Sequence, residues 1–310
     1  MSAWTGVLAI TGPTASGKSA LAMALAERLS GEILNADAFA VYRGLDAGTA
    51  KPSLEDRARV PHHLVDVKDP REPYSAGEFA TAARAIAKDV LARGKLPILC
   101  GGTGFYVRTF FEGLFEGPLR NEALRSALGA VAARRGPAFL HRALTLLDPE
   151  SAARVLPGDA ARATRYLEIA FETGQQPSRL FRERPGVGWD GPAVKIFLEC
   201  ERAVLVSRIE ERCRREILPR LPVEVEGLLA RGVPPDAPGF SAIGYREAVA
   251  FLAGELTEAA FESAVIQSTR RFAKRQETWF RKEPGLVRLK FDDRFLIQSC
   301  VSWTESLRRQ

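Results

Sequence analysis

Short apolar runs alternate with longer, helix-forming stretches along much of the chain. Mostly apolar runs of about four to eight residues predict buried strands, and such runs stand at residues 7–10, 32–37, 60–67, 96–100 and 193–198. The stretches 20–29 and 75–93 have the length and composition of helices, and Ser75 with Glu78 forms a capping-box pattern at the start of the second. This alternation predicts an α/β fold, in which a parallel sheet is flanked by helices.

The pattern changes near Pro118. Between residues 119 and 187 there is no convincing strand pattern, and turns rich in glycine and proline separate several short helical stretches. Because a strand pattern resumes at 193, we expect a core domain made of residues 1–118 and 188–310. The segment 119–187 is expected to be an all-helical insertion domain.

Basic charge is concentrated toward the C-terminus. A charged helix is expected at about 202–218, and a last long helix carries the segment 269–281. Between Arg270 and Lys290 there are eight Lys and Arg against two Glu, although the whole chain carries a net charge of only +6. The insertion adds eleven Arg against seven acids. Such concentrations suit a polyanionic partner, while solvated helix faces are the alternative interpretation.

One loop carries a recognisable chemical pattern. Residues 12–19 read G-P-T-A-S-G-K-S between the first strand and the first helix, which matches the phosphate-binding spacing G-x-x-x-x-G-K-[ST]. Backbone amides and the helix N-terminus can face an anion there, Lys18 adds a charge, and the Ser19 hydroxyl is a candidate Mg²⁺ ligand. The predicted fold is therefore P-loop NTPase-like. The expected diphosphate-binding residues of the loop are Gly12, Thr14, Ala15, Ser16, Gly17, Lys18 and Ser19.

Two further polar residues are expected beside this loop. Asp37 ends the second strand, and Thr103 lies in the glycine turn Gly101–Gly104 directly after another strand. Ligands of open α/β sheets bind beyond the carboxyl ends of the strands, so both residues are predicted near the bound phosphate. A threonine in such a turn can equally act only as a helix cap.

Absent patterns narrow the function. The four cysteines are far apart and show no C-x-x-C spacing, which argues against structural zinc or disulfides and for a reducing, cytoplasmic location. No signal segment and no membrane-spanning run is recognisable. The absence of N-K-x-D argues against a GTPase, and the absence of a clear Walker-B strand argues against an ATPase motor, but a small-molecule kinase stays open. The adjacent His62 and His63 point to opposite faces of a strand and do not suggest a metal site.

Several motifs together resemble those of the bacterial tRNA dimethylallyltransferases. They occur in collinear order over about residues 6–290. They are Gly12–Ser19, Ala36-Asp37 with Val41–Asp46, Gly48–Pro52, Tyr74-Ser75 with Phe79, Gly101–Tyr106, Ile243–Glu247, and Thr269-Arg270 with Ala273–Gln276. The Gly-Thr-Ala-Lys-Pro and Ala-Lys-Arg-Gln segments are more specific than the phosphate-binding loop alone.

The resemblance implies transfer of a dimethylallyl group from dimethylallyl diphosphate to N6 of the adenosine 3′-adjacent to the anticodon (tRNA position 37). Asp37 would then be the general base. Thr103, Lys18 and Ser19 with Mg²⁺ would stabilise the diphosphate leaving group, and Arg212 would bind it. The adenosine would have to leave its stack to react.

The resemblance also implies an anticodon stem-loop as the partner of a monomeric enzyme that needs no membrane. The residues expected to contact the tRNA are Tyr42, Arg162, Arg165, Arg246, Arg270, Lys274 and Arg275. Two positions depart from the family pattern, since Ala38 and Ala40 stand where Ser and Gln are usual. This departure keeps open an RNA-binding protein with a degenerate site, beside a kinase and an enzyme that prenylates free AMP.

Overall fold

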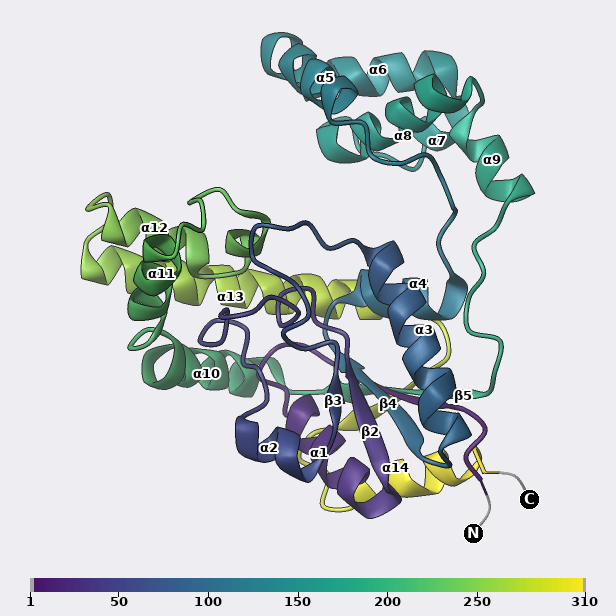
Figure 1. The fold of residues 1–310 in the computed structure, drawn as a ribbon, viewed down its shortest axis with the longest axis vertical. Helices are drawn as coiled ribbons and strands as arrows, with labels where there is room; N and C mark the ends of the chain where they lie inside the picture. The colour runs from purple at the N-terminus through teal and green to yellow at the C-terminus, as the bar shows by residue number, and fades with distance from the viewer. Residues whose placement is uncertain (1–2, 309–310) are drawn as a thin grey trace. The chain divides into compact units, whose positions relative to one another are not determined.

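The computed structural model describes residues 3–308, which divide into two compact units. Residues up to Phe111 and from Trp189 onward form the first unit, and Glu112–Gly188 form the second. The first unit contains the sheet and the second unit is helical (Figure 1). Each unit has its own buried apolar core.

The described residues form one six-stranded parallel sheet, with the order β3-β2-β4-β1-β5-β6. The strands are β1 (Val7–Thr11), β2 (Gly31–Asn35), β3 (His62–His63), β4 (Leu96–Gly101), β5 (Ala193–Glu199) and β6 (Leu286–Lys290). The predicted α/β class with a parallel sheet is therefore confirmed. Strands β1 and β4 are buried along their whole length, which explains their uninterrupted apolar runs.

Helices cover both faces of this sheet. One face packs on α1 (Lys18–Leu29) and α14 (Leu296–Glu305), and the other on α3 (Ala76–Ala92) and α4 (Gly104–Glu112). The predicted capping box is present, because the Ser75 side chain accepts from the Glu78 amide while the Glu78 side chain accepts from the Ser75 amide. A short helix, α2 (Leu54–Arg59), precedes β3.

A third group of helices packs beyond the carboxyl ends of the strands. It consists of α10 (Arg202–Arg212), a π-helical turn (Cys213–Ile217), α11 (Leu221–Ala230), a 3₁₀ turn (Pro238–Ser241), α12 (Tyr245–Leu252) and α13 (Glu258–Phe280). Their apolar faces share a core with the loop that follows β2, including Val41 and Leu45. This core fixes that loop at the strand ends, where the sequence predicts the ligand.

The second unit is a small helical bundle. Its helices are α5 (Glu122–Arg135), α6 (Pro137–Leu147), α7 (Pro149–Ala152), α8 (Ala160–Thr173) and α9 (Pro177–Glu183). Leu140, Leu144 and Leu167 are among the residues of its core. The fully buried Glu168 carboxylate is compensated by Arg125 and Arg165, at 2.9 and 2.6 Å.

The structure differs from the local predictions in two places. The helix expected to be the last long one, α13, begins at Glu258 and is followed by β6 and α14, which the sequence analysis did not predict. The strand expected at 60–67 is reduced to His62–His63, because a positive φ at Leu64 and Asp66 breaks the extended backbone. None of the described helices combines the length and apolarity required to cross a membrane.

Candidate active site

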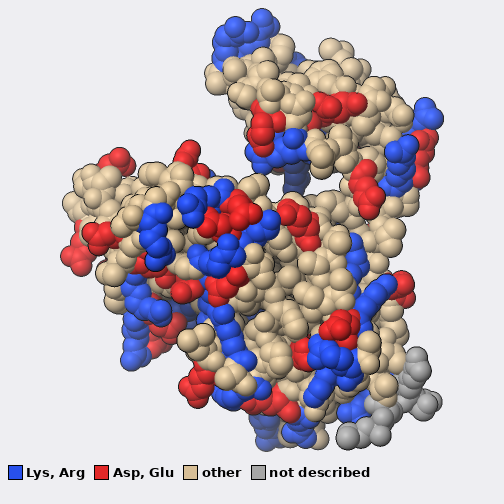
Figure 2. Space-filling model, viewed as in Figure 1, with Lys and Arg blue, Asp and Glu red and all other residues tan. Residues whose placement is uncertain are grey.

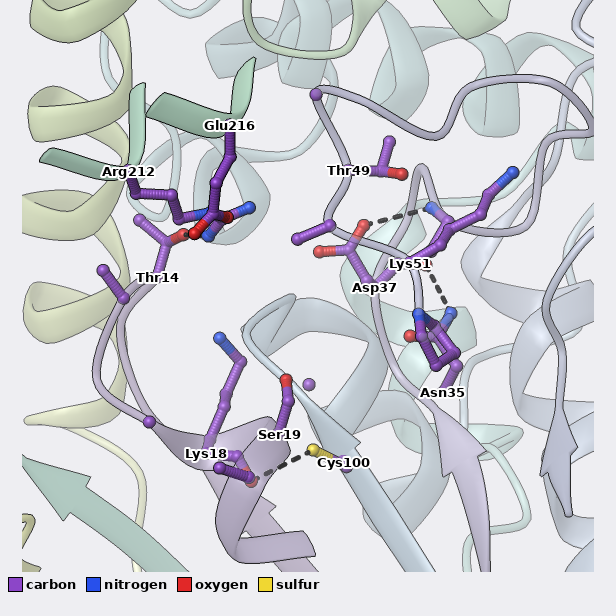
Figure 3. Close-up of a pocket in the computed structure, with 18 of the residues that line it drawn as sticks. Thr14, Lys18, Ser19, Asn35, Asp37, Thr49, Lys51, Cys100, Arg212 and Glu216 are labelled. Carbon is purple, nitrogen blue, oxygen red and sulfur yellow. Dashed lines mark hydrogen bonds and ion pairs between the residues drawn. The ribbon is translucent and has the colours of Figure 1, made fainter. Parts of the chain in front are cut away.

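The phosphate-binding loop leads from the carboxyl end of β1 into α1. Gly17 lies directly before the first helical residue. Its φ is 94°, a conformation that residues other than glycine rarely adopt. Lys18 and Ser19 then stand at the first turn of α1 and point into a cavity of about 1140 Å³ (Figure 3). Burial lowers the pKa of Lys18 against the opposing effects of Cys100 and Asp37. The ammonium group of Lys18 donates to the Pro13 carbonyl within the loop at 3.3 Å.

Asp37 lies on the opposite wall of this cavity (Figure 3). Its Oδ1 accepts hydrogen bonds from the amides of Phe39 at 2.9 Å and Ala40 at 3.3 Å. The side chain of Asn35 donates to the backbone oxygen of Asp37 at 3.3 Å. Among the described residues no donor is recorded for Oδ2, so one carboxylate oxygen is anchored and the other can accept a proton from a ligand.

Thr103 forms hydrogen bonds with the residues on either side of Asp37. Its hydroxyl accepts from the Ala38 amide at 3.1 Å, and its own amide donates to the Ala36 carbonyl at 3.3 Å. Thr103 is not among the described residues that line the cavity. The neighbouring Gly101 is required because a Cβ there would lie 2.2 Å from the Ala36 oxygen. The glycine turn after β4 therefore packs directly on the loop after β2.

Arg212 reaches the cavity from α10. Its Nη1 donates to Oγ1 of Thr14 at 3.1 Å, and its Nε lies 3.7 Å from a carboxylate oxygen of Glu216. Figure 3 shows Arg212 and Glu216 beside Thr14, on the side of the cavity away from Asp37. The structure thus brings Arg212 to the same anion-binding loop as Lys18.

Two expected loop ligands do not line the cavity. Ser16 is fully buried, its amide donates to the Pro13 carbonyl at 3.2 Å, and its Oγ has no partner among the described residues. A Cβ at Gly12 would lie 2.8 Å from that Oγ. Gly12 and Ser16 therefore form the inner side of the loop, whereas Thr14, Ala15, Gly17, Lys18 and Ser19 border the cavity.

The residues expected to contact tRNA are placed in different surroundings. Arg246, Lys274 and Arg275 are exposed in the first unit. Arg270 is also exposed but is ion-paired with Glu210. On the face drawn in Figure 2, basic side chains are interleaved with acidic ones.

Of the three other expected contacts, one is buried and two belong to the second unit. Tyr42 is only 4% exposed and belongs to the apolar core, so direct contact between its side chain and RNA is not available in this conformation. Arg162 and Arg165 belong to the second unit. Arg162 lies 3.4 Å from Asp159, and Arg165 is held by buried Glu168.

The Gly-Thr-Ala-Lys-Pro segment is held by residues that sequence reasoning did not single out. The Lys51 side chain is 3% exposed and donates to Asp46 at 2.7 Å and Asp66 at 2.5 Å. The Glu224 carboxylate accepts from the amides of Asp46 and Ala47 at 3.0 and 2.8 Å. Lys51 therefore borders the cavity with its ammonium group held by two carboxylates.

Tyr245 completes this network. Its hydroxyl donates to Glu224 at 2.6 Å and accepts from the Gly48 amide at 3.3 Å. A Cβ on Gly48 would lie 2.5 Å from the Tyr245 ring, so this position requires glycine. The tyrosine of the Ile-Gly-Tyr-Arg-Glu motif and the glycine of the Gly-Thr-Ala-Lys-Pro motif therefore form one contact.

Gln276, the last residue of the Ala-Lys-Arg-Gln motif, is the other residue that was missed. It is 5% exposed, lines the cavity and bonds to the phosphate-binding loop. The motif itself was the only available signal, because the contact joins residues 262 positions apart.

The chain is similar in sequence to known enzymes. The family model described as IPP transferase matches residues 40–283. The chain is 44% identical over 285 residues to the tRNA dimethylallyltransferase of Koribacter versatilis, covering 91% of each protein. It is 47% identical over 281 residues to that of Anaeromyxobacter dehalogenans, covering 90% of this chain and 92% of the relative.

Solved structures with the same fold carry related names. The tRNA isopentenylpyrophosphate transferase of Bacillus halodurans matches with a TM-score of 0.71 and 35% identity, covering 97% of both chains. A eukaryotic dimethylallyltransferase, described as acting on tRNA, matches with a TM-score of 0.79 and 27% identity, covering 96% of this chain and 76% of the other. The sheet, the cavity and these relatives together show that the chain belongs to the IPP transferase family, a family of prenyl-transferring enzymes.

Proposed function

We propose that this enzyme transfers the dimethylallyl group of dimethylallyl diphosphate to N6 of the adenosine 3′-adjacent to the anticodon in tRNA. The products are N6-isopentenyladenosine in the RNA and diphosphate. The observation that carries the proposal is the placement of Asp37 opposite Lys18 and Ser19 on one cavity. A carboxylate that faces an anion-binding loop suits a reaction in which a nucleophile loses a proton while a diphosphate departs.

The nucleophile requires help from a base. The lone pair of the exocyclic adenine amine is delocalised into the ring, so the neutral amine attacks poorly until its proton is accepted. We assign this role to Oδ2 of Asp37, whose other oxygen is held by the Phe39 and Ala40 amides. The N6–C1 bond forms as the bond from C1 to the bridging oxygen breaks, and the proton of N6 moves to Asp37.

The leaving group requires positive charge. As the bond to C1 breaks, negative charge builds on the diphosphate, and Lys18 with the amides at the N-terminus of α1 would stabilise it. Arg212 would bind the same diphosphate from α10, since its Nη1 already contacts Thr14 on the loop. In this scheme Thr103 positions the Asp37 loop through the Ala38 amide and does not touch the substrates.

A magnesium ion fits this donor set. The described residues contain no group of three or more His, Cys, Asp and Glu side chains that could hold a metal alone. Mg²⁺ instead commonly combines one protein oxygen with phosphate oxygens and waters, and the exposed Ser19 hydroxyl beside the loop supplies such an oxygen. Bound there, the ion would neutralise part of the diphosphate charge.

The RNA would be held by exposed cations. We assign Lys274, Arg275 and Arg246 to phosphate contacts in the first unit and Arg162 to the second, while Arg270 would first have to leave Glu210. Arg165 and Tyr42 would act indirectly, by supporting the surfaces around them. We further propose that the enzyme is monomeric and that it acts in the cytoplasm, where tRNA is modified.

A comparison of two acceptors tests the substrate class. Purified enzyme, Mg²⁺ and labelled dimethylallyl diphosphate are incubated with an unmodified anticodon stem-loop or with free AMP at equal concentration. We expect label in the RNA alone, because the exposed cations suit the phosphate backbone of an RNA, whereas free AMP carries a single phosphate. Label in AMP alone would assign the enzyme to free nucleotides, and RNA binding without label in either tube would indicate a degenerate site.

A further inference from the structure

Gln276 joins two loops of the candidate active site. It lies on α13, and its side-chain oxygen accepts from the Thr14 amide at 2.8 Å. Its side-chain nitrogen donates to the Gly102 carbonyl at 2.9 Å. The amide group thus spans the phosphate-binding loop after β1 and the glycine turn after β4. With 5% of its surface exposed, Gln276 makes both bonds in a largely water-free environment, where lost bonds are costly.

Thr14 is held from a second direction. Arg212 on α10 donates to its hydroxyl at 3.1 Å, while Gln276 on α13 accepts from its amide. Two helices therefore fix one loop residue through two different groups. The Thr14 amide is consequently already used and is not available to a bound diphosphate.

The residue after Thr14 explains why the loop needs such support. Ala15 has a φ of 63°, in the left-handed region that costs energy for any residue with a side chain. Strained conformations of this kind persist only where the surroundings hold them. With Thr14 released, Ala15 can relax, and the amides of the following residues then turn away from the anion.

We propose that Gln276 is a positioning residue that holds the phosphate-binding loop in its diphosphate-binding conformation. This inference rests on the proposed function, since it concerns how the same loop binds diphosphate. Gln276 touches neither substrate nor product in this account. It acts through Thr14 and Ala15, and it makes the loop conformation depend on α13.

The glycine turn offers an independent way to disturb the same contact. A Cβ on Gly102 would lie 2.1 Å from the side-chain nitrogen of Gln276. The substitution Gly102→Ala therefore displaces the glutamine side chain without altering its chemistry, and the second contact of the new Cβ, 3.2 Å from the Gly12 carbonyl oxygen, is relieved by a small shift. Because Gln276→Ala removes the clash, the two substitutions should not be additive when combined.

Equilibrium binding of inorganic diphosphate in the presence of Mg²⁺ tests the inference. We expect Kd to rise about tenfold in Gln276→Ala and in Gly102→Ala, with little further rise in the double variant. KM for dimethylallyl diphosphate should rise in parallel, whereas Kd for the anticodon stem-loop should stay within about twofold. The control is Gln267→Ala, an exposed glutamine on the same helix, which should leave diphosphate binding unchanged.

The outcomes separate the inference from the function. If the wild type binds diphosphate and both single variants bind it with the same Kd, the positioning role alone is overturned. Equal weakening of diphosphate and RNA binding, together with a lowered melting temperature, would show a general structural role and also overturn it. A wild-type enzyme that binds no diphosphate would contradict the proposed function, and the inference would fall with it.

Discussion

At the scale of single residues, the site depends on how Asp37 is presented. The aspartate lies two residues after the end of β2, and two backbone amides hold one of its oxygens. The usual Ser and Gln neighbours are replaced by Ala38 and Ala40, yet the amides of both residues still make bonds, to Thr103 and to Asp37. Backbone groups therefore position the carboxylate without the missing side chains.

The substitution Asp37→Asn tests its role as a base. Asparagine keeps an oxygen that can accept from the Phe39 and Ala40 amides but cannot take a proton. We expect kcat to fall by about 10²–10⁴-fold, the usual contribution of a general base, with unchanged affinity for the stem-loop. Steady-state kinetics and RNA binding measure both quantities, and Asp236→Asn on the surface is the control. An equal loss of RNA binding would assign Asp37 a structural role.

At the scale of elements, an ion pair outside the active site joins Glu32 of β2 to Arg93, the residue that follows α3. The Glu32 carboxylate, 5% exposed, pairs with Arg93 and lies 2.7 Å from Nε2 of His63. Hydrogen bonding by Arg93, supported by His63 and opposed by burial, lowers the pKa of Glu32 to about 2. The charged carboxylate is thus more favourable in the folded chain than in the unfolded one.

This difference predicts a pH-dependent stability. A carboxylate with a depressed folded pKa contributes fully above its unfolded pKa, near 4.5, and loses that contribution as pH falls toward about 2. Because the Arg93 side chain is exposed and screened by solvent, this contribution is on the order of 1 kcal/mol. Between pH 7 and pH 3, the free energy of unfolding should fall more in the wild type than in Glu32→Gln, measured by urea denaturation. Parallel curves for the two proteins would exclude the effect; Glu55→Gln, on exposed α2, is the control.

Helix α13 has two functional faces. One face buries Phe280 in the core and places Gln276 on the phosphate-binding loop. The other exposes Lys274 and Arg275, which stand next to Gln276 in sequence. The helical period alone separates these roles, since adjacent residues point in different directions.

Lys274 tests the outer face. Lys274→Ala should weaken binding of the stem-loop and reduce the slope of log K against log salt by about 1, because one phosphate contact is lost. Filter binding at several salt concentrations measures the slope. Lys95→Ala is the matched control, since this exposed lysine directly precedes β4 at the edge of the sheet opposite the cavity. An unchanged slope in Lys274→Ala would remove this face from the RNA interface.

At the scale of the whole molecule, the sequence predicted those features that depend on neighbouring residues in the chain. The glycine-rich loop and the apolar strands predicted the parallel sheet, and the rule for strand ends predicted that Asp37 lies near the loop. The edge strand β6 was missed because two of the five residues of Leu286–Lys290 are basic and none of the five is fully buried.

Contacts between segments far apart in the chain could not be predicted from the sequence. The burial of Tyr42 depends on helices that follow it by more than 150 residues, such as α10 and α12. The bond between Gln276 and Thr14 likewise joins opposite ends of the first unit. The motifs included Tyr42 and Gln276 but did not reveal that these side chains are buried and contact distant parts of the chain.

The central claim is tested most directly by measuring both products of one reaction without ATP. Wild-type enzyme, Mg²⁺, labelled dimethylallyl diphosphate and the unmodified stem-loop are mixed, and the label in RNA and the diphosphate released are quantified over time. The account predicts equal amounts of the two products, and a loss of both in Asp37→Asn. Diphosphate release without label in the RNA, or a product that forms only with ATP and carries its phosphate, would contradict the assignment of this cavity to prenyl transfer.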